Sequence, residues 1–382
     1  MKIWENTLTA PELGSSGARL LAEDSMLFDI ETTGFSAAYT TLYLIGTIRR
    51  KDDLLVLTQY FADTPDEEPQ LLAHFFEDLT GIRTLVSYNG DGFDLPYLKA
   101  RCEKLHLTHP FDTIVSVDLY KEVCAFRFLL SLPNYKLKTV EAFLGISRSD
   151  PYNGGELIEV YRHYGRTGDK EALLSLKQHN YEDVADMPAL LSLLSYRSLF
   201  EGGFSVTSVE SNLFCDIDGV MQKEMIFTLS QDEPLPGRAS CRYNEYYLRC
   251  DKTVSKLTVR LRDGELKYFF QNPHDYYYLP EEDIAVHKSL ISGVDKDHRK
   301  KATSSTCYTR KKGIFLPQLL CNGIDIREFD RNEYFKLFSP AFRETRKDRL
   351  TWFELTEEFL DSDAALHAYI LHILQKLLLV KP

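Results

Sequence analysis

The stretch "MLFDIETTGF", residues 26–35, begins as an apolar run typical of a buried β-strand and ends with two carboxylates. Asp29 and Glu31 are two positions apart, so in a strand both side chains project from the same face. Two like charges held this close repel each other, and they require a proton, a basic partner or a bound cation. An ordinary solvated strand end is the alternative interpretation, and the rest of the chain must decide between the two.

The bulk composition is that of a globular protein, and we expect it to lie in the cytoplasm. Its 382 residues, 44% of them hydrophobic, suffice for about two to three domains with buried cores. No apolar run of about 18 residues and no apolar leader with a small-residue cleavage site occurs, so we expect neither membrane spans nor secretion. Seven scattered cysteines without a C-x-x-C pair argue against a disulfide framework and a structural zinc site, so we expect reduced thiols.

Residues 1–200 are expected to form one α/β domain. Runs of apolar and β-branched residues alternate first with turns and then with segments of helical periodicity. The expected elements are an antiparallel meander of strands at 26–30, 40–48 and 54–62, a helix at 67–80, a strand at 84–89, a helix at 94–105 and mainly helices over 111–200. This order predicts strands followed by β-α alternation.

Residues 201–382 are expected to form a second, α+β domain of unknown role, with a basic stretch and C-terminal helices. Asp263-Gly264, between two alternating runs, predicts a type I′ hairpin turn. Thr351 and Glu354 fit a capping box, and "DAALHAYILHILQKLLLV" has the spacing of a helix that faces a core.

The net charge of −12 is divided unequally, with −10 in residues 1–200 and −2 in residues 201–382. Residues 287–312 carry a local +6, which predicts either a phosphate-binding patch or a solvated charged loop. The adjacent run Tyr276-Tyr277-Tyr278 fits either stacking on unpaired bases or half-buried packing. The basic residues are Lys288, Lys296, Arg299, Lys300, Lys301, Arg310, Lys311 and Lys312.

Two further stretches place acidic residues beside expected element ends. In "SYNGDGFDLPYL", residues 87–98, a turn follows a strand, and Asp94 opens the next helix either as an N-cap or as a carboxylate aimed at the strand edge. In "QHNYEDVADM", residues 178–187, His179 and Asp183 are four positions apart on a helix and share one face.

Together, "FDIETTGF", "YNGDGFDLPYL" and "HNYEDV" resemble the three motifs of the DEDD superfamily of 3′–5′ exonucleases. With "YKLKTVEAFLGISR", the resemblance is to the stand-alone bacterial ribonuclease H-like proteins regarded as exonucleases, and it covers about residues 24–200. It implies an RNase H-like mixed sheet flanked by helices. In the third motif, histidine stands at the spacing of the tyrosine subfamily.

The resemblance also implies a set of roles for individual residues. Asp29, Glu31, Asp94 and Asp183 would bind two Mg²⁺ or Mn²⁺ ions, and carboxylate oxygens are ligands suited to both metals. His179 would act as general base or orient the attacking water. Contacts with nucleic acid are implied for Thr32, Thr33, Phe35, Asn89 and Phe93.

The sequence therefore favours a metal-dependent 3′–5′ exonuclease acting on a single-stranded 3′ end of DNA or RNA. One alternative is a catalytically inactive module on the same fold that binds nucleic acid or protein. Another is an endonuclease that acts on RNA–DNA hybrids. Four clustered carboxylates favour catalysis, because a protein that only binds phosphate has no need of them.

Overall fold

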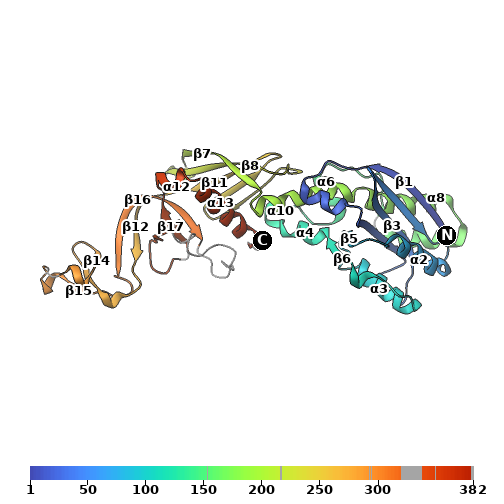
Figure 1. Cartoon of the computed structure of the whole chain (residues 1–382), viewed down its shortest axis with the longest axis horizontal. Coiled ribbons are helices and arrows are strands. Elements are labelled where there is room, and N and C mark those ends of the chain that lie inside the picture. The colour runs from blue at the N-terminus through green and yellow to red at the C-terminus, as the bar shows by residue number, and fades with distance from the viewer. Residues whose placement is uncertain are drawn as a thin grey trace. The chain divides into compact units, whose positions relative to one another are not determined.

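The computed structural model describes residues 1–152, 154–215, 217–291, 293, 295–319, 338–348 and 350–379. The chain divides into two compact units (Figure 1). The first comprises Met1–Leu199 together with Glu233–Arg238, and the second comprises Phe200–Asp232 and the residues from Ala239 onward.

A six-stranded mixed sheet forms the centre of the first unit, in the order β1-β4-β3-β2-β5-β6. The meander β2-β3-β4 is antiparallel, as predicted, whereas β5 and β6 run parallel to β2. Strands β1 and β6 were not predicted, because each is short of the apolar residues that mark a buried strand. The strands are β1 (Lys2–Thr9), β2 (Ser25–Thr32), β3 (Leu42–Lys51), β4 (Leu54–Phe61), β5 (Thr84–Ser87) and β6 (Val115–Asp118).

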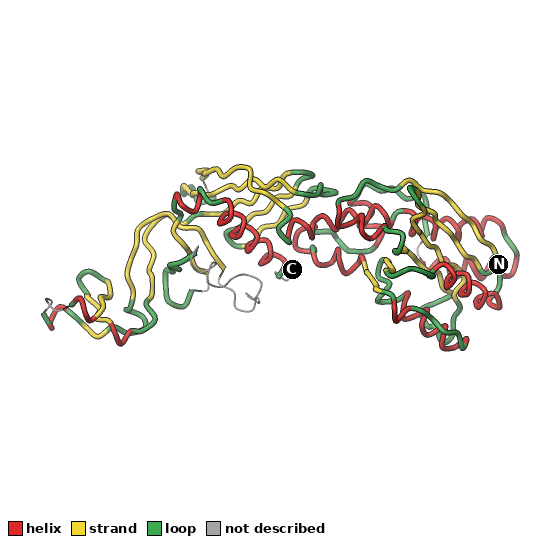
Figure 2. The backbone as a smooth tube through the Cα atoms, viewed as in Figure 1, coloured by secondary structure: helices red, strands yellow, loops and turns green. Residues whose placement is uncertain are grey.

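Helices cover both faces of this sheet (Figure 2). On one face, Phe28 and Ile30 of β2 pack in a core with Phe75 of α2. On the other face, Tyr43 of β3 packs with Tyr161 of α7 and with residues of α8. The helices are α1 (Ser15–Ala18), α2 (Glu68–Asp78), α3 (Asp94–Leu105), α4 (Leu119–Ala125), α5 (Arg127–Leu130), α6 (Leu137–Phe143), α7 (Gly154–Thr167), α8 (Lys170–Ala185), α9 (Met187–Leu190) and α10 (Leu194–Phe200). The predicted fold, a mixed sheet flanked by helices, is confirmed.

A glycine in β3 allows α8 to approach the sheet closely. Gly46 pairs with Asp29 across the β2–β3 ladder. A Cβ atom at Gly46 would lie 2.4 Å from Oδ1 of Asn180 and 2.7 Å from Cγ2 of Val184, both on α8. A side chain at this position would force the side chains of Asn180 and Val184, or α8 itself, to shift, so glycine lets α8 lie over the carboxylates of β2.

Among its described residues, the second unit is rich in β-structure and has three sheets, ordered β7-β8-β11-β10-β9, β12-β16-β17 and β14-β13-β15. Helix α13 buries Leu366, Tyr369 and Ile370, which confirms the predicted core-facing helix. The elements are β7 (Phe204–Cys215), β8 (Met221–Gln231), β9 (Ala239–Tyr243), β10 (Tyr246–Cys250), β11 (Val254–Arg260), β12 (Arg262–Phe269), β13 (Tyr276–Leu279), β14 (Ile284–His287), β15 (Lys300–Lys301), β16 (Tyr308–Leu319), β17 (Leu350–Glu354), α12 (Glu357–Leu360) and α13 (Asp363–Leu378).

The hairpin predicted at Asp263-Gly264 is wrong. Both residues lie inside β12, which pairs with β16 rather than with β11. Gly264 stands opposite Gly313 in that ladder, with a φ of 150° that favours glycine. Gly264 is therefore part of an extended strand and not of a turn. The long pairing of β12 with β16 outweighs the local preference for a turn.

The capping box predicted at Thr351 and Glu354 is also wrong. Both residues belong to β17, and the buried Thr351 hydroxyl donates to the carbonyl oxygen of Gln318 at 3.0 Å. The helices that follow are capped by Thr356 and Ser362, whose side chains accept backbone N–H groups. Pairing of β17 with β16 overrides the local capping pattern.

Membrane-spanning helices and disulfide bonds were both considered from the sequence. Within the residues described above, no helix combines the length and the apolar character needed to cross a membrane. The described cysteines are free thiols, namely Cys102, Cys124, Cys215, Cys241, Cys250 and Cys307. Cys321 lies outside the described residues.

Candidate functional site

The carboxylates predicted from the three motifs come together with His179 at one edge of the first sheet. Asp29 and Glu31 lie on β2, on the face opposite Phe28 and Ile30, and the ends of the parallel strands β2 and β5 share this edge. Asp94 begins α3, directly after the turn that follows β5. His179 and Asp183 both lie on α8.

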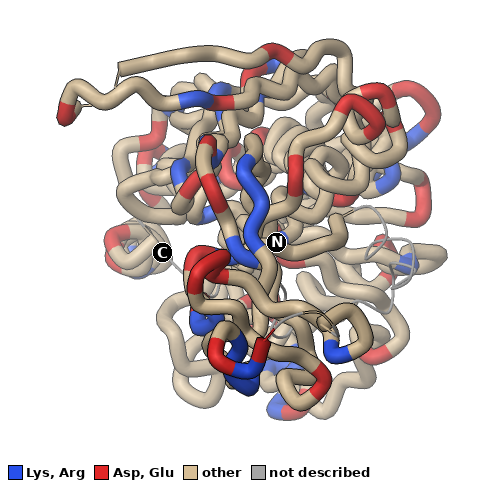
Figure 3. Tube along the Cα trace, turned by 90° about the vertical axis from the view of Figure 1, so that its left-hand side faces the viewer, with Lys and Arg blue, Asp and Glu red and all other residues tan. Residues whose placement is uncertain are grey.

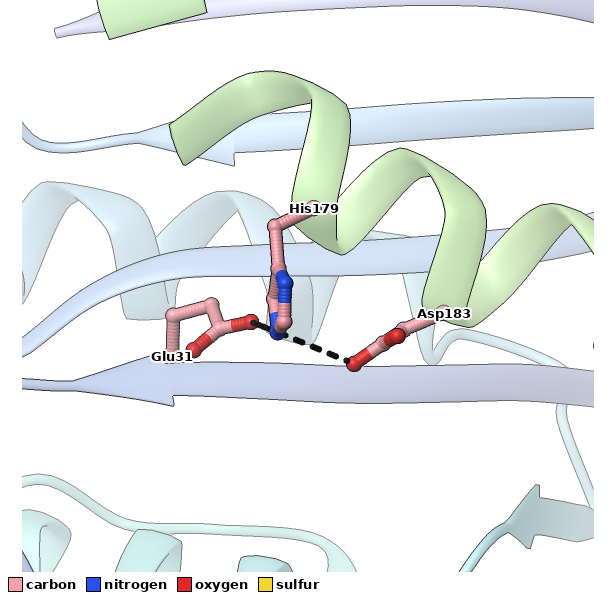
Figure 4. A group of neighbouring side chains, drawn as sticks. All are labelled: Glu31, His179 and Asp183. Carbon is pink, nitrogen blue, oxygen red and sulfur yellow. Dashed lines mark ion pairs between the residues drawn. The ribbon is translucent and has the colours of Figure 1, made fainter. Parts of the chain in front are cut away.

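Three of these side chains offer ligand atoms close enough for one metal ion. Ligand atoms of Glu31, His179 and Asp183 all lie within 4.8 Å of one another. Nε2 of His179 is 3.6 Å from Oε1 of Glu31 and 3.4 Å from Oδ2 of Asp183 (Figure 4). The set combines hard carboxylate oxygens with one imidazole, which suits Mn²⁺ and, through the oxygens, Mg²⁺.

The side chains of this cluster are largely buried, and burial disfavours the charged form of a carboxylate. Glu31 is 7% exposed, Asp94 5% and His179 4%. Burial, followed by the nearby charge of Asp183, raises the pKa values of Asp29 and Glu31 well above their ordinary range. Burial also raises the pKa of Asp94 to about 7. Burial and mutual repulsion disfavour the ionised form of these carboxylates unless a cation lies beside them, so the donor set fits a divalent metal.

Asp94 is not the N-cap of α3. Phe93 occupies that position without a capping side chain, and Asp94 is the first helical residue. Oδ1 of Asp94 accepts a hydrogen bond from the backbone N–H of Ile30 at 3.3 Å. The carboxylate is therefore aimed at β2, which was the second of the two roles expected for this residue.

Asp150, which the sequence reasoning missed, orients His179. Nδ1 of His179 lies 2.6 Å from Oδ2 of Asp150. Asp150 also accepts from Nζ of Lys138 and from the backbone N–H of Tyr152, each at 3.1 Å. Although burial opposes it, hydrogen bonds from His179 and Lys138 hold the pKa of Asp150 below its ordinary value. An ionised Asp150 keeps the proton on Nδ1 and turns Nε2 towards the carboxylates.

Arg148 and Asn180 were missed as well, because no local pattern distinguishes them. Nε and Nη2 of Arg148 donate to the two carboxylate oxygens of Glu141, and its Nη1 forms an ion pair with Asp183. Nδ2 of Asn180 donates to Oδ2 of Asp29 at 3.2 Å, while its Oδ1 accepts from Gln59.

The residues implied to contact nucleic acid in the first unit lie beside the cluster. Phe35 is 83% exposed, and its ring meets that of Phe93 edge-on at 6.1 Å. Thr32 and Thr33 shape the intervening loop, since the Thr32 hydroxyl donates to the carbonyl of Gly34 and the Thr33 N–H to that of Thr41. Asn89, an exposed residue with a φ of 66°, forms the turn after β5. Their contacts with nucleic acid remain predictions.

The basic residues from Lys288 to Lys312 belong to the second unit. Part of their charge is neutralised, since Arg310 pairs with Glu265 and Lys311 with Glu354. In the described part of the chain, no ion pair is formed by Lys288, Lys296, Lys300, Lys301 or Lys312. Basic and acidic segments are interspersed along the trace (Figure 3).

The three consecutive tyrosines beside this stretch make contacts within the protein. The ring of Tyr276 stacks on Phe270 at 4.4 Å. The guanidinium of Arg299 lies 4.9 Å from the ring of Tyr277, and the Tyr278 hydroxyl donates to Asp283. These contacts agree with the packing role considered for the tyrosines.

Comparison with known proteins identifies the class of the first unit. Residues 26–195 match the family model of the RNase H superfamily. The first unit therefore contains an RNase H-like domain, as the sequence resemblance implied, and the match spans all five residues of the cluster.

Relatives match parts of the chain at low identity. An uncharacterized protein of Bacillus subtilis, YprB, is 27% identical over 209 residues, which are 52% of this chain and 48% of that protein. DNA polymerase 1 of Sulfolobus acidocaldarius is 30% identical over 156 residues, 36% of this chain and 18% of the polymerase. The chain thus spans about half or less of the length of these relatives. A family B DNA polymerase structure from Pyrobaculum calidifontis aligns with a TM-score of 0.36 at 19% identity, covering 46% of this chain and 25% of that one.

Proposed function

We propose that the protein is a metal-dependent 3′–5′ exonuclease of the DEDD type, which hydrolyses phosphodiester bonds of single-stranded DNA or RNA. The observation that carries the proposal is the convergence of Asp29, Glu31, Asp94 and Asp183 with His179 at one buried sheet edge. Such a cluster is costly to fold without a cation, and the RNase H superfamily match spans it.

The four carboxylates would hold two Mg²⁺ or Mn²⁺ ions. When bound, such ions supply an activated water and neutralise charge on the phosphoryl oxygens and the leaving oxygen. Asp29 and Asp94 are held in place before any metal arrives, by Asn180 and by the Ile30 N–H respectively. These hydrogen bonds reduce the reorganisation needed at the moment of reaction.

His179 serves as the general base. Its Nδ1 proton is directed to Asp150, so Nε2 would accept a proton from the attacking water when the carboxylates alone hold the metal. The water oxygen bonds to the phosphorus of the last phosphodiester and the bond to the upstream 3′-oxygen breaks. The 3′-oxygen takes up a proton to become a hydroxyl, and a nucleoside 5′-monophosphate leaves. Asp150 stabilises the imidazolium that forms and plays no direct part in bond making.

Nucleic acid as the substrate class has support from outside the cluster. A relative at 30% identity over 156 residues is named a DNA polymerase. In the second unit, the lysines without ion pairs, such as Lys300 and Lys301, would bind phosphates of a longer strand. The second unit would then act as an accessory domain that adds affinity and no chemistry.

One observation favours the inactive alternative. The ion pair between Arg148 and Asp183 neutralises a carboxylate that a metal would need. If this pair persists in the presence of Mg²⁺, the site lacks one ligand and the fold only binds. In the active enzyme, Arg148 would release Asp183 to the metal and keep its two contacts with Glu141.

The decisive experiment measures nucleotide release from single-stranded DNA and RNA in Mg²⁺, in Mn²⁺ and in EDTA. Wild type is compared with Asp29→Asn and with Asp112→Asn, an exposed carboxylate outside the cluster. We expect release only with metal, loss of at least about a thousandfold in Asp29→Asn, and none in Asp112→Asn. Binding of oligonucleotide without any release in either metal would establish the inactive alternative.

A further inference from the structure

An open groove with a volume of about 630 Å³ begins at the carboxylate cluster. Asp29 and Asp183 form one end of its lining, so anything that fills the groove reaches oxygens of the candidate metal site. We call the remainder the Arg127 groove, formed chiefly by Asn89, Tyr120, Arg127, Asn134, Tyr135 and Lys136. Its volume falls within the range of about 300–1,000 Å³ common for ligand sites.

Two cations in this groove are left without acidic partners. Among the residues that the structure describes, no carboxylate pairs with Arg127 or with Lys136, and both side chains are exposed. Neighbouring cations are paired instead, Lys121 with Asp91 and Lys138 with Asp150. Two cations without a carboxylate partner, beside a strongly acidic site, suit an anionic ligand that must approach those carboxylates.

Aromatic rings hold the Arg127 guanidinium in the groove. It lies 5.0 Å from the ring of Tyr135 and 5.9 Å from that of Tyr120, and it donates to the Tyr120 hydroxyl at 3.0 Å. Both tyrosines are half-buried, so each ring is anchored and still partly accessible. Planar guanidinium and tyrosine faces are surfaces on which unpaired bases stack.

An amide adds a neutral donor to the same surface. Oδ1 of the exposed Asn134 accepts from the Lys136 N–H at 3.1 Å and from the Thr139 hydroxyl at 2.7 Å. These two bonds fix the orientation of the amide and leave its NH₂ group available. The groove thus offers phosphate oxygens a guanidinium, an ammonium and an amide donor.

The lining of the groove does not include Thr32, Thr33 or Phe35, the residues expected to hold the terminal nucleotide. The groove is therefore lined by other residues than that segment. We propose that it binds the strand immediately 5′ of the bond that is cut, with Arg127 and Lys136 on its phosphates and the tyrosine faces against an unpaired base. This inference rests on the proposed function, because the cut bond defines the direction of the strand.

The test compares the double variant Arg127→Ala/Lys136→Ala with Arg166→Ala/Lys170→Ala, which removes two exposed cations outside the groove. Anisotropy of a short labelled oligothymidylate in EDTA measures binding without chemistry. We expect the groove variant to raise Kd about tenfold or more. We also expect it to lower the slope of log affinity against log salt by about 1.4, for two lost phosphate contacts.

A second substrate separates the upstream strand from the terminal nucleotide. Thymidine 5′-(p-nitrophenyl phosphate) carries the terminal nucleoside but no upstream strand. We expect the groove variant to raise KM for oligonucleotides while kcat/KM for this ester changes less than about twofold. Equal losses on both substrates, or binding equal to that of the control variant, would overturn the proposal.

If the proposed nuclease function is wrong, the hydrolysis and binding assays give a different pattern of results. If wild type hydrolyses neither substrate, the nuclease assignment fails, and the anisotropy measurement alone decides on the groove. Weaker binding in the groove variant but not in its control would still support a site for single-stranded nucleic acid. Equal binding in both would refute it.

Discussion

Nδ1 of His179 lies 2.6 Å from Oδ2 of Asp150, and this contact sets which nitrogen faces the carboxylate cluster. The two residues come from α8 and from the segment that precedes α7. Because Asp150 is held in turn by Lys138 and the Tyr152 N–H, the imidazole has little freedom to turn over. The base, its orienting group and the metal ligands are therefore assembled by tertiary packing.

Replacing Asp150 by Asn should impair catalysis more than folding. The Asn amide can present its NH₂ group to Nδ1, which places the proton on Nε2 and blocks it as a base. We expect kcat to fall by about 10²–10⁴, as for comparable losses of a positioned base, with a change in the acid limb of the pH profile. Urea unfolding provides the folding control, and an unchanged kcat would show that Asp150 does not orient the base.

The stability of the metal-free protein should fall as pH rises. The pKa values of Asp29, Glu31 and Asp94 are raised above those of an unfolded chain by burial, so the folded state holds more protons at intermediate pH. For Asp94, this stabilisation is fully present at a pH near the ordinary pKa of 3.8. It is lost as the pH rises through the folded-state pKa of about 7. We expect a lower free energy of unfolding at pH 8 than at pH 5.5 in EDTA.

Mg²⁺ should reverse this loss, because it replaces the protons of the cluster. Urea unfolding at both pH values, with EDTA and with Mg²⁺, measures the effect. Asp94→Asn should weaken the pH dependence, since it removes one buried charge while Oδ1 can still accept from Ile30. Equal stability at pH 5.5 and pH 8 in EDTA would show that the cluster is not short of counter-charge.

A methyl group at Gly46 should disturb the packing of α8 on the sheet. The added Cβ would lie 2.4 Å from Oδ1 of Asn180, so either the helix or the Asn180 side chain must shift. We expect Gly46→Ala to cost about 1–3 kcal/mol of unfolding free energy and to reduce activity together with stability. Gly165→Ala in α7 is the matched control, since no atom lies within 4 Å of its added Cβ. A fully active Gly46→Ala protein would contradict this positioning role.

Removing the Phe35 ring should weaken substrate binding without affecting the fold. The side chain is 83% exposed, so little packing is lost. We expect Phe35→Ala to cost about 1–3 kcal/mol in kcat/KM, the range for one base stacked on an aromatic ring. Tyr39→Ala, at 91% exposure in the same loop, is the control. Identical kinetics of the two variants would remove Phe35 from the substrate site.

The lysines of the second unit should contribute affinity in a salt-dependent way. We expect Lys300→Ala/Lys301→Ala to weaken binding of long oligonucleotides, with a loss that shrinks as salt is raised, and to leave kcat unchanged. Lys256→Ala in β11 is a lysine control outside this stretch. Binding that is unchanged at low salt would show that the stretch is only a solvated loop.

Sequence motifs located the candidate site well because each motif is local and lies at an element boundary. The i, i+2 spacing on β2 and the i, i+4 spacing on α8 determine which side chains share a face before any tertiary structure is known. Asp150, Arg148 and Asn180 carry no such periodicity. They acquire their roles only when the chain folds back and brings them against α8 or β2.

The second unit shows the opposite behaviour. Asp263-Gly264 and Thr351 with Glu354 are strong local signals, yet both segments pair with β16. Pairing between strands distant in sequence is invisible to local patterns and can outweigh turn and capping preferences. The predicted helix at the C-terminal end succeeded because its apolar spacing extends over several turns.

The most direct test of a 3′–5′ exonuclease is the direction of digestion. A 5′-labelled single strand with a free 3′ end is incubated with Mg²⁺ or Mn²⁺, beside the same strand closed by an inverted 3′ nucleotide. We predict a ladder that shortens stepwise from the free 3′ end, disappears with EDTA and is absent from the closed strand. Cleavage of both strands at internal positions, or no cleavage of either, would contradict the proposed function.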